Sequence, residues 1–169
     1  DVTVAVIGAG MVGRTLIGFL KNHELDVVVY DPYLSEKDAG ELGVKKVSLE
    51  EAFESATVIS NHTPNTPETT KMLGWDLFSR MRDNATFINT GRGATVDEAA
   101  LIRALKEKPT LTALLDVTHP EPADPTSELF DLPNAHLSTH LAGALGNEVS
   151  RLADACIDEF ENWCEGKPL

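Results

Sequence analysis

The sequence predicts an α/β fold with one parallel, doubly wound sheet. Short apolar runs of strand length alternate with segments of helical periodicity along the whole 169-residue chain, which is typical of a parallel sheet with crossover helices. The polar residues that suggest chemistry all follow predicted strands, and ligands of such sheets bind beyond the carboxyl ends of the strands. The chain is long enough for one domain with a real core and too short for two large ones.

The first predicted βαβ unit, residues 2–31, carries the most specific local signal. Residues 4–7 form an apolar run short enough to be a strand buried on both faces. Three glycines follow at G-x-G-x-x-G spacing, namely Gly8, Gly10 and Gly13. Apolar residues then recur at helical spacings of three and four, at Val12, Leu16, Phe19 and Leu20. A second apolar run, at residues 27–30, ends at Asp31.

Each part of this unit has a physical role in binding a dinucleotide. Gly8 allows the tight exit from the strand, Gly10 lets the backbone approach a pyrophosphate, and Gly13 lets the helix pack close to the sheet. The amides at the helix start, around Met11 and Val12, face the phosphates at the positive end of the helix dipole. The unit therefore predicts a single nucleotide-binding domain with a Rossmann-type sheet.

Asp31 predicts which dinucleotide binds. Its carboxylate can accept hydrogen bonds from the hydroxyls of an adenosine ribose, and it would repel a 2′-phosphate. No arginine follows Asp31 closely to receive such a phosphate. The predicted cofactor is therefore NAD(H) rather than NADP(H).

The remaining elements continue the alternation. Further strands are expected at residues 44–47, 57–60, 85–89, 111–115 and 135–138. Helical segments are expected at residues 35–42, 48–55, 75–81, 98–108, 126–130 and 146–164. Ser48 opens a capping box and Asp97 is a suitable N-cap. Two prolines make residues 61–69 a loop.

The composition excludes several classes of partner. The net charge of −13, from 27 acidic and 14 basic side chains, argues against nucleic acid or an anionic membrane. No apolar run approaches the length of a membrane span. Cys156 and Cys164 lack the further cysteines of a metal or disulfide framework, so no metal site is predicted. We interpret the two thiols as reduced and structural in a cytoplasmic protein.

Four segments along the chain carry a family resemblance. They are GAGMVG with YDP, HTPNTPET, INTGRGATVDEAAL, and LLDVTHPEP followed by LPNAHLSTHLAG. In this order and at these spacings the sequence resembles the D-isomer-specific 2-hydroxyacid dehydrogenases, and specifically their NAD-binding domain. Residues 89–101 are the most specific block, and the resemblance covers nearly the whole chain.

The resemblance implies three catalytic residues. Arg92 corresponds to the arginine that binds the substrate carboxylate and polarises its carbonyl. His140 corresponds to the catalytic histidine, and Glu121 to the glutamate that supports it. The chemistry agrees, because a guanidinium fork can hold a carboxylate and a carbonyl together. A histidinium with a carboxylate partner is also a natural proton donor for the reduction of a 2-keto acid.

The resemblance also implies residues that line the cofactor. The matched positions are Pro64, Thr90, Gly91, Asp116 and Gly143. The chain departs from the family pattern at Thr118, where an aromatic residue is common, and at Thr139, where proline is common. Both departures bear on how the loop of His140 is held.

The other histidines and the aromatic residues receive structural interpretations. We expect His62 to order its proline loop. Three histidines are interpreted as incidental, namely His23, His119 and His136. Three aromatic residues at helical positions are interpreted as packing, namely Trp75, Phe160 and Trp163.

Family members carry a separate substrate domain, formed from segments on both sides of the NAD-binding domain, and a helix before the first strand that helps to form a dimer. Neither matches any part of residues 1–169, so we expect an excised or truncated cofactor domain of an intact homodimer. Because Asp1 directly precedes a strand, the native N-terminus is expected to lie elsewhere. The implied reaction transfers a hydride between NAD(H) and a small 2-hydroxy or 2-keto acid.

Two other functions stay open. An NAD-sensing protein on the same scaffold, such as a transcriptional corepressor, can keep the three catalytic residues, and turnover of 2-keto acids by the full-length protein distinguishes it. A dehydrogenase of the β-hydroxyacid type shares GAGMVG, but it gives no reason for those three residues and needs a catalytic lysine on a later helix. The identity of the 2-hydroxy acid is also open, because the missing domain shapes the pocket.

Overall fold

The computed structural model describes residues 2–168. The chain forms two compact units, which divide between Thr139 and His140. The first unit holds the sheet and the helices that cover it, and the second holds one long helix.

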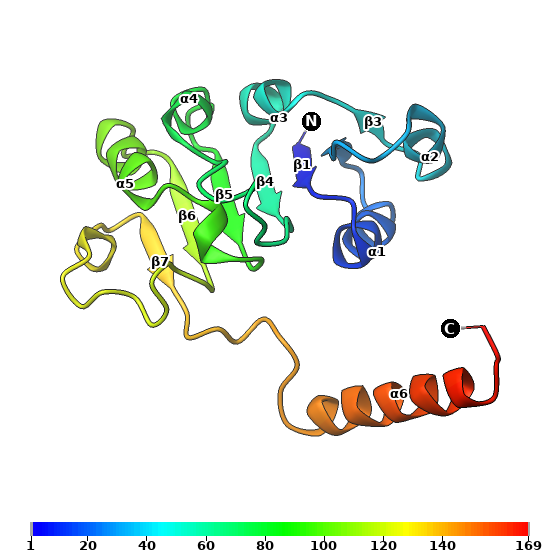
Figure 1. The fold of residues 1–169 in the computed structure, drawn as a ribbon. Helices are drawn as coiled ribbons and strands as arrows, with labels where there is room; N and C mark the ends of the chain where they lie inside the picture. The colour runs from blue at the N-terminus through cyan, green and yellow to red at the C-terminus, as the bar shows by residue number, and fades with distance from the viewer. Residues whose placement is uncertain (1, 169) are drawn as a thin grey trace. The chain divides into compact units, whose positions relative to one another are not determined.

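The first unit is built on a seven-stranded parallel sheet with the strand order β3-β2-β1-β4-β5-β6-β7 (Figure 1). The strands are β1 (Thr3–Ile7), β2 (Asp26–Tyr30), β3 (Lys45–Lys46), β4 (Val58–Asn61), β5 (Thr86–Asn89), β6 (Thr112–Leu115) and β7 (Ala135–Leu137). Each strand expected from the sequence is present, so the predicted fold is confirmed. The strand order reverses between β1 and β4, and ligands bind at such a switch point.

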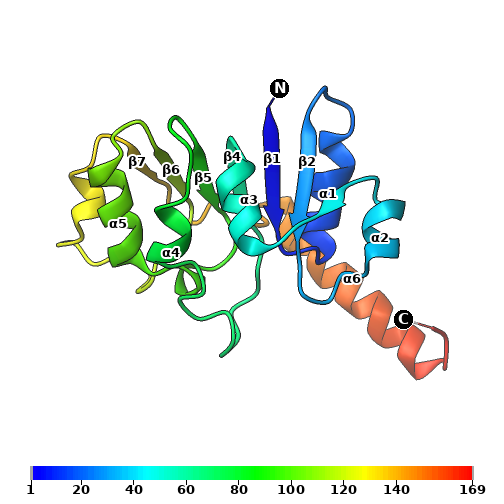
Figure 2. The same ribbon diagram turned by 90° about the horizontal axis from the view of Figure 1, so that it is seen from above.

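Helices cover both faces of this sheet (Figures 1 and 2). The helices α1 (Met11–Leu20) and α2 (Glu36–Glu41) pack on one face, and α3 (Leu49–Ser55), α4 (Trp75–Phe78) and α5 (Glu98–Glu107) pack on the other. Successive residues of β1 point to opposite faces. Ala5 and Ile7 therefore enter the larger core under α3 to α5, whereas Val6 packs with Ile17 of α1.

The larger core is centred on three phenylalanines, one each from α3, α4 and β5. Phe78 meets Phe53 and Phe87 in edge-to-face contacts, with ring centroids 5.7 and 5.1 Å apart. Trp75 is partly buried against the same core, and the guanidinium of Arg103 lies 3.6 Å from the centre of its ring. The packing role expected for Trp75 is therefore confirmed.

The start of α1 differs from the expected apolar face. Its buried residues are Gly13 and Ile17, whereas Val12 and Phe19 are 65% and 67% exposed. Gly13 has no side chain, so the helix approaches the sheet most closely along the line that joins it to Ile17. This contact turns Val12 away from the core.

Three other predicted elements are shorter than expected. The edge strand β3 has two residues, both lysines, and charged side chains are common on sheet edges. Helix α4 ends at Phe78 because the amides of Arg80 and Met81 bond to carbonyls three residues earlier, which is the tighter 3₁₀ pattern. Residues 126–130 form only the 3₁₀ helix η2 (Glu128–Phe130).

Both predicted N-caps are confirmed. Ser48 Oγ accepts a hydrogen bond from the amide of Glu51 at 3.1 Å, and Asp97 Oδ1 accepts one from the amide of Ala100 at 3.4 Å. Each cap satisfies an amide that has no partner within its helix. The two helices therefore begin where the sequence predicts.

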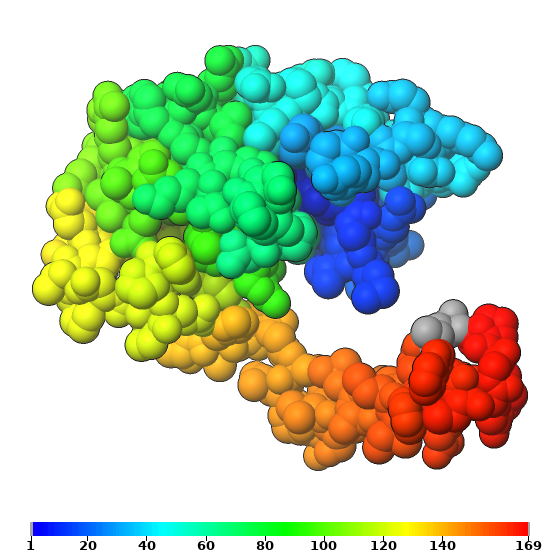
Figure 3. Space-filling model, viewed as in Figure 1, coloured from blue at the N-terminus to red at the C-terminus, as the bar shows by residue number. Residues whose placement is uncertain are grey.

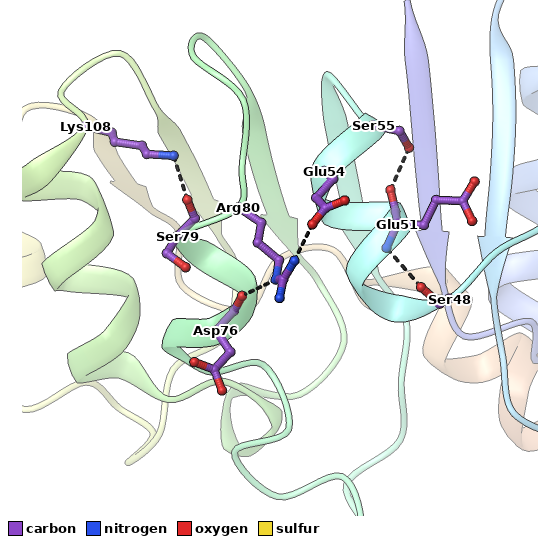
Figure 4. A network of polar contacts seen from close by, with 8 residues as sticks. All are labelled: Ser48, Glu51, Glu54, Ser55, Asp76, Ser79, Arg80 and Lys108. Atoms are coloured by element: carbon purple, nitrogen blue, oxygen red, sulfur yellow. Dashed lines mark hydrogen bonds and ion pairs between the residues drawn. The ribbon is translucent and has the colours of Figure 1, made fainter.

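Polar contacts join α3, α4 and α5 on their shared face (Figure 4). Arg80 pairs through Nη1 with Glu54 of α3, and its Nε donates to the carbonyl of Asp76 at 2.8 Å. Lys108, which follows α5, donates from Nζ to the carbonyl of Ser79 at 2.7 Å. These cations satisfy carbonyls of the short helix α4 and the turn that follows it, while the exposed ion pair adds little stability.

The second unit contains the helix α6 (Asn147–Cys164), which has no buried residue. Phe160 and Trp163, which the sequence indicates as packing residues, pack only on each other: they are exposed and stack with ring centroids 6.0 Å apart. Cys156 and Cys164 are free thiols, as expected, but they are exposed rather than structural. The physical reason is that a single helix has no second layer against which to bury an apolar face.

Candidate functional site

A pocket of about 570 Å³ lies at the switch point of the sheet, within the first unit. In Figure 3 the blue surface of the N-terminal segment adjoins the green surface of the middle of the chain on this unit. Three segments line it: the start of α1, the loop after β4 and the loop after β5. The lining residues are Gly10, Met11, Val12, His62, Thr63, Pro64, Asn65, Thr90, Gly91 and Arg92. The structure thus brings residues from three predicted cofactor segments to one place, together with Arg92.

The glycine-rich turn has the geometry that the sequence predicts. Gly8 has a φ of +94°, and a Cβ there would lie 3.0 Å from the carbonyl of His62. A Cβ on Gly13 would lie 2.0 Å from the carbonyl oxygen of Gly8, so only glycine allows this approach of α1 to the turn. Gly10 is exposed, and nothing would lie within 4 Å of a Cβ there. A ligand can therefore approach the backbone closely at Gly10.

The N-terminus of α1 is open to the pocket. Gly10 is its N-cap, makes no side-chain capping bond, and is followed by a first turn without acidic residues. Met11 and Val12, which begin the helix, line the pocket. Helix N-terminal amides with no side-chain partner attract anionic groups such as a pyrophosphate. The residues present fit the phosphates of a dinucleotide.

Asp31 is fixed against the glycine-rich turn. Its Oδ2 accepts a hydrogen bond from the amide of Ala9 at 2.8 Å, and its Oδ1 accepts from the amides of Tyr33 and Leu34 at 2.8 and 3.1 Å. A carboxylate offers about four acceptor positions, so these three bonds leave capacity for a ribose hydroxyl. This chemistry suits a ribose ligand, and the role of Asp31 as that ligand stays a prediction.

Arg14 is a further residue of the turn that the sequence pattern does not single out. Its Nε donates to the carbonyl of Ala9 at 2.9 Å, while Asp31 holds the amide of the same residue. Two side chains therefore hold the peptide groups on either side of Ala9. The only available signal was the position of Arg14 directly after the third glycine.

The loop after β4 lacks regular structure, as predicted from its prolines. Thr69 Oγ1 organises it by donating to the carbonyl of Pro64 at 2.6 Å and accepting from the amide of Thr66 at 2.8 Å. His62 was expected to order this loop. Its ring Nε2 instead bonds to Ser60 Oγ of β4 at 2.8 Å, and burial lowers the pKa of His62. The ring is thus anchored to the strand, and the residue lines the pocket.

The loop after β5 presents Arg92 at the pocket. The side chain of Arg92 is exposed, and its Nη1 donates to the carbonyl of Gly91 at 2.7 Å. The short 3₁₀ helix η1 (Gly93–Thr95) follows directly. A Cβ on Gly93 would lie 2.0 Å from the carbonyl oxygen of Thr118. Only glycine therefore allows this loop to pack against the segment that follows β6.

Asp116 lies at the end of β6, beside β5. It is buried, its amide donates to the carbonyl of Asn89 at 3.0 Å, and Ser138 Oγ donates to its carboxylate. The predicted cofactor-lining position is thus at the carboxyl edge of the sheet. It is not among the residues that line the 570 Å³ pocket.

Comparisons with known proteins agree with this geometry. Residues 1–142 match the family described as "D-isomer specific 2-hydroxyacid dehydrogenase, NAD binding domain". The chain belongs to this family.

The relatives of this NAD-binding domain are longer proteins. D-3-phosphoglycerate dehydrogenase of Archaeoglobus fulgidus is 34% identical over 167 residues, which cover 99% of this chain and 32% of that protein. Glyoxylate reductase of Korarchaeum cryptofilum is 37% identical over 158 residues, 94% of this chain and 48% of that protein. The apo structure of Rhodotorula graminis D-mandelate dehydrogenase superposes with a TM-score of 0.88 at 25% identity, covering 100% of this chain and 50% of that one. The chain thus spans about a third to a half of the length of these proteins.

The remaining residues implied by the dehydrogenase family lie in different units. Glu121 is exposed on the loop after β6 in the first unit. His140 and Gly143 belong to the second unit, and His140 has a φ of +59°, which is rare for a residue with a side chain. The pairing of Glu121 with His140 stays a prediction.

Two further properties concern the described residues of this NAD-binding domain. Within residues 2–168, no helix is both long and apolar enough to cross a membrane. In the same residues, no group of three or more His, Cys, Asp or Glu side chains could hold a metal ion.

Proposed function

We propose that the full-length protein is an NAD-dependent D-2-hydroxyacid dehydrogenase, an oxidoreductase that transfers a hydride between NAD(H) and a small 2-hydroxy or 2-keto acid. The observation that carries this proposal is the position of Arg92. It lines the same pocket as the uncapped start of α1. A dinucleotide on the helix and a carboxylate on Arg92 would therefore share one pocket.

The family resemblance implies the roles of these residues, and their chemistry supports them. When bound, NADH supplies the hydride. Arg92 offers a planar fork that can hold the carboxylate and polarise the neighbouring carbonyl. His140 donates a proton to the carbonyl oxygen during reduction and accepts it during oxidation. Glu121 supports the imidazole of His140.

The test is NADH oxidation by the full-length protein with glyoxylate, pyruvate and hydroxypyruvate. Turnover of at least one of these acids supports the proposal. In the active protein, His140→Gln should lower kcat by about 10²- to 10⁴-fold, with the Kd for NADH unchanged. Binding of NADH without turnover of any 2-keto acid would contradict the proposal and favour an NAD-sensing binding protein.

The isolated chain of 169 residues is expected to bind NADH without useful turnover. Without a substrate domain, water would reach Arg92, and nothing would fix the substrate opposite the cofactor. Turnover by the isolated chain at rates typical of enzymes would overturn this expectation.

We also propose that the intact protein is a homodimer in the cytoplasm. The family resemblance supports the dimer. The two exposed cysteines, both free, support a reducing compartment. Sedimentation of the full-length protein and fractionation of the cells that make it test the two statements separately.

A further inference from the structure

The side chain of Asn61, the last residue of β4, is hydrogen-bonded to residues of the segments that follow β4 and β5. This side chain is fully buried, as are those of Asn89 at the end of β5 and Thr95 in η1. Buried amide and hydroxyl groups are stable only when their hydrogen bonds are satisfied. The partners of these three side chains therefore show what the cluster holds in place.

The carboxamide of Asn61 makes every hydrogen bond of which it is capable. Its Nδ2 donates to Asn89 Oδ1 at 3.0 Å and to Thr95 Oγ1 at 2.9 Å. Its Oδ1 accepts from the amide of Thr63 at 3.3 Å and from Thr63 Oγ1 at 2.7 Å. An asparagine side chain has two donor hydrogens and two acceptor positions. One side chain thus joins the loop after β4 to the loop after β5.

The far side of this cluster holds the backbone around Arg92. The carbonyl of Arg92 accepts from Thr95 Oγ1 at 2.7 Å and from Asn89 Nδ2 at 3.3 Å. The amide of Gly91 donates to Asn89 Oδ1 at 3.1 Å. Buried side chains therefore fix the peptide group that follows Arg92 and the peptide group between Thr90 and Gly91.

The side chain of Arg92 depends on this backbone for its direction. This side chain is exposed, and its hydrogen bond goes to the carbonyl of Gly91, the preceding residue of the same loop. This hydrogen bond does not tie the guanidinium to the buried cluster. Its position in the pocket is therefore set mainly by the φ and ψ angles of Arg92, which the cluster maintains at −138° and 130°.

We propose that Asn61, Asn89 and Thr95 are positioning residues for the dehydrogenase reaction, because their hydrogen-bonded cluster aims Arg92 at the substrate carboxylate. The inference rests on the proposed function and adds a specific support for one of its residues. Fully satisfied buried networks are rigid, and a misplacement of about 1 Å in a reacting geometry can lower the rate by about 100-fold. The cluster therefore matters for catalysis as well as for folding.

The sharpest test replaces Thr95 in the full-length protein by valine and by serine. Thr95→Val keeps the shape but removes the hydroxyl that accepts from Asn61 and donates to Arg92. We expect kcat/KM for the 2-keto acid to fall by about 10- to 100-fold, with the Kd for NADH unchanged. Thr95→Ser keeps the hydroxyl, so it should restore most of the wild-type kcat/KM.

A second readout does not depend on turnover. Oxalate, a carboxylate ligand, should bind more weakly to the NADH complex of Thr95→Val than to that of the wild type. Hydrogen exchange at the amide of Gly91 should be faster in the same variant. Asn61→Asp keeps the acceptor bonds to Thr63 but loses both donor bonds, so it should also weaken oxalate binding and speed exchange at Gly91. If this variant fails to fold, the comparison of Thr95→Val with Thr95→Ser still tests the proposal.

Two outcomes would overturn the inference. One is a Thr95→Val protein with wild-type kcat/KM and wild-type exchange at Gly91. The other is an equal loss of NADH affinity and kcat/KM, because the cluster would then serve the cofactor or the fold. A wild-type protein that reduces no 2-keto acid would count against the proposed function, while exchange at Gly91 would still show whether the cluster holds the loop.

Discussion

The amide of Ala9 donates a 2.8 Å hydrogen bond to Asp31 Oδ2, which places a carboxylate directly against the glycine-rich turn. The amides of Tyr33 and Leu34 hold the other oxygen of the same carboxylate. A fixed negative charge can accept hydrogen bonds from ribose hydroxyls, but it repels a 2′-phosphate that approaches closely. We therefore predict that Asp31 distinguishes NAD(H) from NADP(H) at this turn.

We expect the protein to bind NADH more tightly than NADPH, and Asp31→Ala to narrow the difference. Loss of a charged hydrogen bond should weaken NADH binding by about 1.5–3 kcal/mol, whereas loss of the negative charge removes a repulsion for NADPH. Calorimetric titration with both cofactors measures the two changes. Asp31→Asn is the control, since it keeps an acceptor without the charge. Equal or tighter binding of NADPH by the wild type would contradict the prediction.

Gly13 and Gly18 lie on the same helix and predict opposite effects of one substitution. In Gly13→Ala the new methyl group would meet the carbonyl oxygen of Gly8 at 2.0 Å, so we expect a loss of about 1–3 kcal/mol in unfolding free energy and weaker NADH binding. In Gly18→Ala it would meet nothing within 4 Å, so we expect a gain of about 0.5–1 kcal/mol. Urea unfolding of both variants checks the signs. A stabilised Gly13→Ala protein would show that α1 does not need this close contact.

His62 predicts part of the pH dependence of stability. Burial lowers its pKa in the folded protein, so the folded state favours the neutral ring. The unfolded chain takes up the proton at a pKa of about 6.5. The buried neutral ring of His62 therefore contributes its full stability above a pH of about 6.5. This contribution is lost as the pH falls below that value toward the lower pKa of His62 in the folded protein.

Urea unfolding of the wild type and His62→Gln at several pH values tests this expectation. Between pH 7.5 and 5, the unfolding free energy of the wild type should fall more than that of His62→Gln, which cannot take up the proton. Glutamine can still hydrogen-bond to Ser60, so the comparison isolates the titration. Parallel profiles of unfolding free energy against pH would show that His62 does not contribute to the pH dependence of stability.

The sheet could be predicted from the sequence because its signals are local. Each strand is a short apolar run, and three glycines at fixed spacing indicate the turn after β1. The face of α1 was harder, since its closest contact with the sheet is made by Gly13, a residue without a side chain. The spacing of apolar side chains does not indicate a contact that a glycine makes through its backbone.

The supports of the site could not be predicted for a different reason. Asn61 and Arg14 are isolated polar residues with no periodicity, and Thr95 lies within the block of residues 89–101 without a role that the resemblance implies. Their importance comes from partners in other segments, such as the bond between Asn61 and Asn89, which are 28 residues apart in sequence. Only the pairing of β4 with β5, which puts these two residues opposite each other, makes the contact visible.

Arg92 gives the most direct test of the proposed substrate chemistry. A guanidinium can hold a carboxylate and a carbonyl with two parallel donors, whereas an ammonium acts as a point charge. Arg92→Lys keeps the charge but loses this geometry, and loss of one charged hydrogen bond costs about 1.5–3 kcal/mol. We therefore expect kcat/KM for the 2-keto acid to fall by about 10- to 100-fold in the full-length protein, with the Kd for NADH unchanged. Arg103→Lys makes the same replacement on the exposed face of α5 and should leave kcat/KM at the wild-type value; equal effects of the two substitutions would show that Arg92 does not bind the substrate.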